Sequence, residues 1–224
     1  MPVAFVTAAS QSFTGATSVN ISVTPSGTNR CMYAWSCTNG DNAGENSATF
    51  NSVAMTELLD SAPAGAFQLL ALYRLIAPDA TTANVTISWS TSADGIAGVI
   101  VLEGVDQTTA DGGATAASSA FAGSTTPSVT IASESGDWVQ DFVSAIGAPS
   151  SGTAGASQTE RLDAHNGDDF FLALSSNQDG EASTAMDWTM DASGRWRTGG
   201  VSVNPAAGGG GGVKVPAFML LGVR

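Results

Sequence analysis

The only histidine of the chain, His165, is the first residue to examine for catalytic chemistry. It stands in LDAHNGDDF, with Asp163, Asp168 and Asp169 around it. A Ser-His-Asp triad would have to use this imidazole, and no G-x-S-x-G sequence accompanies it to supply a nucleophile. The surrounding Asn, Gly and Asp residues favour a solvated polar turn, with a catalytic base as the alternative.

Carboxylate pairs are the second kind of candidate, because glycoside hydrolysis uses two of them around the scissile bond. The nominees are Glu103, Asp141, Asp187 and Asp191. Asp141 shares the parity of Val139 and Val143 in WVQDFV, which fits either a partly exposed sheet or a perturbed carboxyl in a cleft. We favour exposure near a sheet edge. Since nothing indicates a second carboxylate at the required separation, we predict no catalytic residue and no enzyme activity.

Acidic loops and tryptophans are the remaining candidates for ligand binding. The loops TNGDNAGEN (38–46), HNGDD and NQDGE offer oxygen ligands for Ca²⁺, but none has the spacing of a known calcium loop. Ordinary Asp-Gly turns are favoured, so we expect no metal and no cofactor.

Among the tryptophans, Trp35 and Trp89 lie in apolar strands and are expected in the core. Trp196, between Arg195 and Arg197, is the best candidate for glycan stacking, although a core or interface position is favoured.

The charge balance excludes several kinds of partner. Twenty acidic residues against seven basic ones give a formal net charge of -13, which repels phosphate backbones and anionic lipids. No apolar run approaches the roughly 18 residues that a membrane-spanning helix needs. The start, MPVAFVTAASQS, lacks the positive region of a secretory signal and is interpreted as a first strand. We therefore expect a soluble protein with no nucleic-acid partner and no membrane partner.

Hydrophobic periodicity predicts the fold class. Apolar and polar residues alternate with period two between turns rich in Gly, Asn, Asp and Pro, as in SVNISVT. This pattern predicts an all-β, antiparallel two-sheet β-sandwich of jelly-roll type. Besides the strands in the first 37 residues, the expected strands are 53–59, 67–76, 84–90, 97–103, 128–132, 137–145, 169–175, 185–191 and 196–203.

The two cysteines lie in CMYAWSC, which is apolar on both faces and therefore predicts a central strand. In a strand, Cys31 and Cys37 are about 20 Å apart, beyond the reach of a disulfide. Reduced core residues are favoured, and a turn between them or a pairing elsewhere is the alternative.

Four segments carry a family resemblance: AGVIVLEGVDQTTADGGATAASSA (97–120), TTPSVTIASESGDWVQDFVSA (125–145), AGASQTERLDA (154–164) and WRTGGVSVNPA (196–206). They resemble a repetitive β-sandwich family found in tailed-phage virion proteins, prophage-like regions and some bacterial surface proteins. In outline the likeness covers residues 17 to 206. Its members are similar in fold and show no common active site, so the resemblance implies architecture and transfers no catalytic residue.

The C-terminus differs from the rest of the chain. Residues 1–207 are expected to form the sandwich, and the five glycines at 208–212 a flexible linker to an apolar arm that completes 208–224. Partner-binding residues on this arm are expected to be Val213, Val215, Phe218, Met219, Leu220 and Leu221. Their burial would be too favourable for a monomer to leave them exposed, so the arm is expected to dock on its own sheet or on a neighbour.

These observations and the resemblance together imply a bacteriophage virion structural protein. The most concrete form is a capsid decoration (cement) protein on the outer capsid surface, made in the host cytoplasm. Expected partners are the major capsid protein or other virion subunits, together with copies of itself in a homo-oligomer, for instance a trimer. The alternative is a carbohydrate-binding or adhesive module of a phage tail, a fibre or a bacterial surface.

Overall fold

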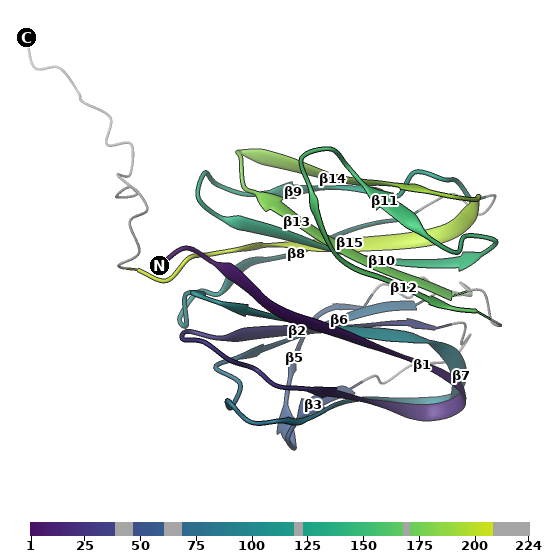
Figure 1. Cartoon of the computed structure of the whole chain (residues 1–224), viewed down its shortest axis with the longest axis horizontal. Coiled ribbons are helices and arrows are strands. Elements are labelled where there is room, and N and C mark those ends of the chain that lie inside the picture. The colour runs from purple at the N-terminus through teal and green to yellow at the C-terminus, as the bar shows by residue number, and fades with distance from the viewer. Residues whose placement is uncertain (39–46, 61–68, 119–122, 168–170, 208–224) are drawn as a thin grey trace, which may run out of the picture.

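The structure is a computed structural model that describes residues 1–38, 47–60, 69–118, 123–167 and 171–207. Within these ranges the chain is all-β and every strand pair is antiparallel, as predicted. The described residues contain no helix that is long and apolar enough to cross a membrane. The sheets stack face to face (Figure 1).

Three hydrogen-bonded sheets are present instead of the two that were expected. The seven-stranded sheet has the order β4-β3-β7-β2-β6-β5, with β1 paired to β7. Its strands are β1 (Ala4–Val23), β2 (Cys31–Thr38), β3 (Ser47–Phe50), β4 (Val53–Ala54), β5 (Thr56–Asp60), β6 (Leu69–Ile76) and β7 (Ala83–Glu103).

The second half of the chain supplies the other two sheets. A five-stranded sheet has the order β12-β13-β10-β15-β8, and a three-stranded sheet the order β11-β14-β9. Their strands are β8 (Asp111–Ser118), β9 (Ser128–Ala132), β10 (Trp138–Gly147), β11 (Gly152–Ala154), β12 (Thr159–Asn166), β13 (Phe171–Asp179), β14 (Ser183–Met190) and β15 (Gly194–Val203).

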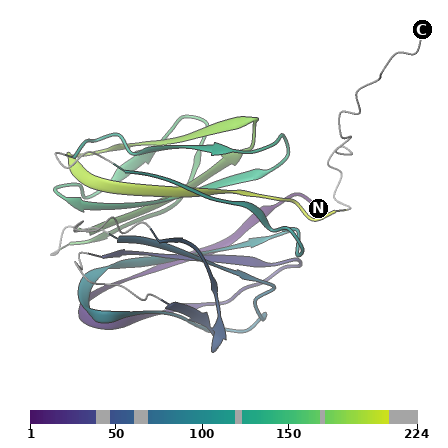
Figure 2. The same ribbon diagram turned by 180° about the vertical axis from the view of Figure 1, so that it is seen from behind.

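The seven-stranded sheet folds over on itself, because its two longest strands bend together. The register of β1 with β7 shifts around Ala16, which pairs with Ala93, and on either side of this bend the strands continue in different layers. The N-terminal half of β7 pairs with β3 and its C-terminal half with β2. With the other two sheets this makes a stack of four layers, visible in Figures 1 and 2.

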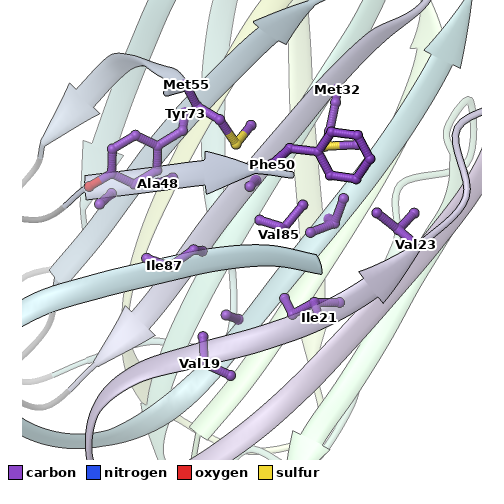
Figure 3. Packing of buried hydrophobic residues seen from close by; sticks show 14 of the residues in the cluster. Val19, Ile21, Val23, Met32, Ala48, Phe50, Met55, Tyr73, Val85 and Ile87 are labelled. Atoms are coloured by element: carbon purple, nitrogen blue, oxygen red, sulfur yellow. The ribbon is translucent and has the colours of Figure 1, made fainter. Parts of the chain in front are cut away.

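Three cores fill the spaces between the four layers. The first core lies inside the folded sheet and contains Met32, Phe50 and Val85 (Figure 3). The middle core lies between the folded sheet and the five-stranded sheet, where Trp35 meets Phe142 with ring centroids 5.0 Å apart. The outer core lies beneath the three-stranded sheet and falls into two clusters.

The prediction that CMYAWSC is a central strand is confirmed. All eight residues of β2 are buried, because its even-numbered face covers the first core and its odd-numbered face the middle core. Cys31 and Cys37 are free and fully buried, as predicted, and burial raises the pKa of each thiol to about 12.

The two halves of the chain repeat one strand order, which the sequence analysis missed. Counting β1 and β7 as two strands each because of their bend, residues 4–103 (unit 1) form a sheet β1-β7-β2-β6-β5 opposite a sheet β1-β7-β3. Residues 111–203 (unit 2) form β8-β15-β10-β13-β12 opposite β9-β14-β11. Apart from the two-residue β4, which extends unit 1 beyond β3, these orders correspond position by position, so the two units share one sandwich fold, as a tandem duplication would produce.

Matching irregularities support the duplication. The register of β5 with β6 shifts between Glu57 and Leu59, and that of β12 with β13 shifts between Glu160 and Leu162. These bulges lie in the similar sequences TELLD (56–60) and TERLD (159–163). Bulges are specific features of a fold, so their recurrence at equivalent positions is hard to reconcile with chance.

Several expected element boundaries are corrected. Segments 84–90 and 97–103 were expected as two strands, but the SADG between them lies within β7 at its bend. His165 is in strand β12 instead of a turn. Strands β3, β8, β11 and β12 were not predicted, whereas 128–132 coincides with β9. The expected linker and arm at 208–224 lie outside the described residues.

Close packing of β7 on β2 gives a test of the middle core. A Cβ atom added at Gly98 would lie 2.4 Å from Cη2 of the fully buried Trp35, whereas one at the exposed Gly112 of β8 would meet nothing within 4 Å. We expect Gly98→Ala to lower the free energy of unfolding by about 1–3 kcal/mol and Gly112→Ala to change it by less than about 1 kcal/mol. Urea unfolding measures both, and equal midpoints would contradict this packing.

Candidate functional site

Among the described residues, those expected to do acid-base chemistry form no enclosed catalytic pair: the charges of His165 and Asp191 both act on Asp163, but all three side chains are exposed. His165 is exposed on β12, and its neighbours Asp168 and Asp169 lie outside the described residues. Asp187 and Asp191 are exposed, and Asp191 accepts hydrogen bonds from Ser150, which lower its pKa to about 2. Across the described ranges no group of three or more His, Cys, Asp or Glu side chains is placed to hold a metal ion.

Trp196 lies in the core, the position favoured for it over a role in glycan stacking. Its side chain is only 8% exposed and packs in the outer core, and its indole Nε1 donates a hydrogen bond to Oγ of Ser124 at 2.7 Å. A buried indole offers no face to a sugar, so the glycan-binding role is not available to Trp196. Trp35 and Trp89 are in the core, as predicted.

Asp141 was expected to be exposed near a sheet edge, and this prediction is wrong. Its side chain is fully buried on β10, the middle strand of the five-stranded sheet, on the face covered by the three-stranded sheet. Trp188 Nε1 donates to its Oδ2 at 2.7 Å. The backbone N–H of Ser176 donates to its Oδ1 at 2.6 Å, and Ser176 Oγ donates to the same atom at 3.0 Å.

The protonation of Asp141 is set by burial. Desolvation raises its pKa to about 7, although the hydrogen bonds from Trp188 and Ser176 act in the opposite direction. The charge of Asp187 makes a small further contribution that raises the pKa. Among its hydrogen-bond donors in the described structure there is no cation, so the carboxyl group takes up a proton near neutral pH.

Unit 1 shows that this fold does not require a carboxyl group at the position. Asp141 lies opposite Gly200, and the equivalent residue opposite Val99 in unit 1 is Ala34. The indole of Trp89, equivalent to Trp188, donates instead to the backbone oxygen of Ala16 at 2.7 Å. Asp141 is therefore a particular feature of unit 2, and its complete enclosure excludes direct contact with a substrate in this conformation.

A second buried polar cluster joins the two units. Asp111, at the start of β8, accepts a hydrogen bond from the Tyr33 hydroxyl at 2.9 Å and forms an ion pair with Arg74 at 2.8 Å. The Tyr33 side chain is fully buried, which raises its pKa well above the usual range. Since Tyr33 and Arg74 belong to unit 1 and Asp111 to unit 2, the cluster fixes the units to each other.

The strand edges differ in their suitability for binding another strand. β5 and β12, at one edge of each unit, carry the charged sequences TELLD and TERLD. β1, at the other edge of unit 1, has twenty residues without a single charge or proline. Charged residues and prolines protect sheet edges against added strands. The short edge strands β4, β9 and β11 also lack both, so β1 is the longest unprotected edge of the described structure.

Both faces of this edge are apolar and incompletely covered. Ala4 to Ser10 are all half-buried, with Val6 and Ala9 on the first core and Phe5 and Ala8 on the middle core. Within the described residues β1 pairs only with β7. We call the side of Ala4–Ser10 that faces away from β7 the β1 edge.

The C-terminal segment begins next to this edge. The amino group of Met1 donates to the backbone oxygen of Ala206 at 3.2 Å, so the chain approaches position 207 beside the start of β1, as Figure 2 shows. The predicted partner-binding residues, Val213, Val215, Phe218, Met219, Leu220 and Leu221, lie outside the described residues. Their role remains a prediction, whereas the position of Ala206 beside Met1 is an observation.

No protein-family model, curated protein or solved structure matches this chain. The resemblance to phage β-sandwich proteins therefore stays a prediction, and the function has to be argued from the geometry described above.

Proposed function

We propose that the protein is a non-enzymatic structural protein of a bacteriophage virion, most concretely a capsid decoration protein on the outer head surface. The observation that carries this proposal is the unprotected, apolar β1 edge beside the start of an apolar C-terminal segment. Such an arrangement suits attachment by strand addition, in which main-chain hydrogen bonds supply affinity and side-chain pockets supply specificity.

The strand order supports a jelly-roll type for each unit. In unit 2 the sheet β8-β15-β10-β13 faces the sheet β9-β14-β11, an alternation of sequential strands between two sheets that is typical of jelly rolls. β12 departs from that pattern by pairing with β13. Jelly rolls build many viral capsid domains as well as lectins, so this architecture fits the proposal without requiring it.

The surface chemistry supports protein partners. Among the described residues the large exposed hydrophobic side chains are Met1 and Val53, so the sandwich itself offers no broad apolar patch. The apolar residues of 213–221 are then the material for contacts to the major capsid protein, to other virion subunits or to further copies. A net charge of -13 suits a place on the outer surface, away from packaged DNA.

One observation favours the second candidate, a carbohydrate-binding module. An open hollow on the outer face of unit 1 is lined by neutral hydroxyl and amide side chains, which can hydrogen-bond to sugars; they come from Ser22, Thr49, Asn51, Ser52, Thr82, Asn84 and Thr86. The lining contains no aromatic residue for stacking. This candidate is therefore the weaker one.

Electron microscopy of particles from the native source, labelled with an antibody to this chain, tests the proposal. Regular label over the heads is the expected result. Label confined to tails would move the protein to a tail or fibre role within the virion. Absence of label from all particles would reject the virion proposal, and glycan arrays with Asn84→Ala as the matched variant would then test the hollow.

A further inference from the structure

We infer that the β1 edge of one copy receives residues 213–221 of a second copy as an added antiparallel strand. This inference rests on the proposed function, because it names the acceptor and the partner of the same C-terminal segment. The result would be a homo-oligomer joined by exchanged arms.

The environment of the β1 edge specifies what kind of strand fits. β1 belongs to an inner layer, with the first core on one face and the middle core on the other. A strand added beside Ala4–Ser10 would lie against the half-buried rims of both cores, with Val6 and Ala9 on one face and Phe5 and Ala8 on the other. A strand that covers two apolar rims needs apolar side chains on both of its faces, whereas a strand with one solvated face alternates.

The C-terminal segment has this continuous pattern. From Ala217 to Leu221 the sequence AFMLL contains only apolar residues, in contrast to the alternation of SATF or STAMDWTM elsewhere in the chain. Pro216 stands before this run, a position that an edge strand tolerates. The segment therefore matches a site with two apolar faces better than the surface of an outer sheet.

The other strand edges fit this segment less well. β5 and β12 carry acidic residues, which an apolar strand would have to desolvate. β8, the unit 2 equivalent of the first part of β1, has Gly and Ala at most positions, and Gly112, Gly113, Thr115 and Ala116 are exposed. It offers little apolar surface beside an added strand.

Geometry favours a second copy over the same chain. The last described residues lie beside Met1, so a segment that continued from there along its own β1 would be parallel to it, whereas every described strand pair is antiparallel. An antiparallel arrangement within one chain would first have to span Ala4–Ser10, roughly 20 Å at about 3.3 Å per residue. That distance uses the whole reach of residues 207–212. A segment from another copy has no such restriction.

Charge complementarity also favours contact between the C-terminal segment of one copy and the sandwich of another. The last seventeen residues contain Lys214 and Arg224 and no acid, so they carry +2, and the remainder carries -13 - 2 = -15. Two sandwiches repel each other, while the segment of one copy is attracted to the sandwich of the other.

Cross-linking between differently labelled copies tests the inference. One copy carries Thr7→Cys or Ser10→Cys on β1, and the other carries Ala217→Cys or Met219→Cys. The native Cys31 and Cys37 are fully buried and do not interfere. We expect a disulfide-linked heterodimer after mild oxidation of the mixture. Thr130→Cys, exposed on β9 far from the β1 edge in the strand order, is the matched control and should not cross-link.

Two results would overturn the inference. The second experiment uses one chain that carries both Thr7→Cys and Met219→Cys. An intrachain disulfide in this double variant, with no heterodimer in the mixture, would place the segment on its own β1. No cross-link in either experiment would place it on another protein. As a second measurement, sedimentation of the full-length chain should show an oligomer that deletion of 208–224 converts to a monomer. If the antibody labels virion heads but the purified full-length chain is a monomer, the proposed function stands and the inference of exchanged C-terminal arms is rejected.

Discussion

Raising the pH from about 4 to about 8 is expected to lower the free energy of unfolding by about 4 kcal/mol through Asp141 alone, and Asp141→Asn is expected to remove that dependence. Folding raises the pKa of this carboxyl from its ordinary value of 3.8 to about 7, so the folded state binds its proton more tightly than the unfolded state. The stabilisation is fully present below the unfolded pKa. It is lost as the pH rises through the folded pKa.

The slope of stability against pH is the informative quantity for Asp141→Asn. An amide at this position turns its NH₂ group toward one of the N–H donors of Trp188 or Ser176, which costs stability at every pH. Urea unfolding at intervals between pH 4.5 and 8.5 measures the slope for both proteins. Asp79→Asn, which changes an exposed carboxylate, is the control and should follow the wild type. If the stability of Asp141→Asn has the same slope against pH as that of the wild type, burial of Asp141 is not the cause of the pH dependence.

Truncating Phe142 to alanine is expected to lower the free energy of unfolding by about 3–5 kcal/mol. Its ring is fully buried in the middle core, with centroids 5.0 Å from Trp35 and 5.9 Å from Tyr33. The cavity would therefore open between the two units, and both should lose stability in one cooperative transition.

Val53→Ala is the matched control for this truncation, because Val53 is 51% exposed and its truncation should cost less than about 0.5 kcal/mol. Calorimetry and urea unfolding measure both variants. Two separate transitions, or a loss for Phe142→Ala as small as the control, would show that the units fold independently and that the middle core contributes little.

Much of the secondary structure is predictable because it depends on local patterns. The alternation of SVTI predicts β9 at 128–132, and the two apolar faces of CMYAWSC predict the central strand β2. Prediction failed where local composition and tertiary pairing disagree. SADG has the composition of a turn, but pairing with β1 holds it within β7. The charged TERLDAHN has only a short apolar alternation, formed by Leu162 and Ala164, yet pairing with β13 makes it strand β12.

The duplication was missed for a related reason. Its clearest identities, TELLD with TERLD and SVNI with SVTI, are short and separated by different distances in the two units. Their equivalence becomes visible only when the bulges of β5 and β12 are seen to lie at the same place in the strand order. The two units keep the same strand order although their sequences differ, because many different sequences can form the same pairs of strands.

The sequence by itself determined the all-β class, the reduced buried cysteines and which residues share a face of the strands that it predicted. Only the tertiary structure decided which faces are covered. Asp141 was assigned to an exposed position from its parity, and it is buried beneath β14, a strand distant in sequence, whose Trp188 donates a hydrogen bond to it. The physical reason is that alternation is a property of one strand, whereas exposure depends on the layers that other parts of the chain stack upon it.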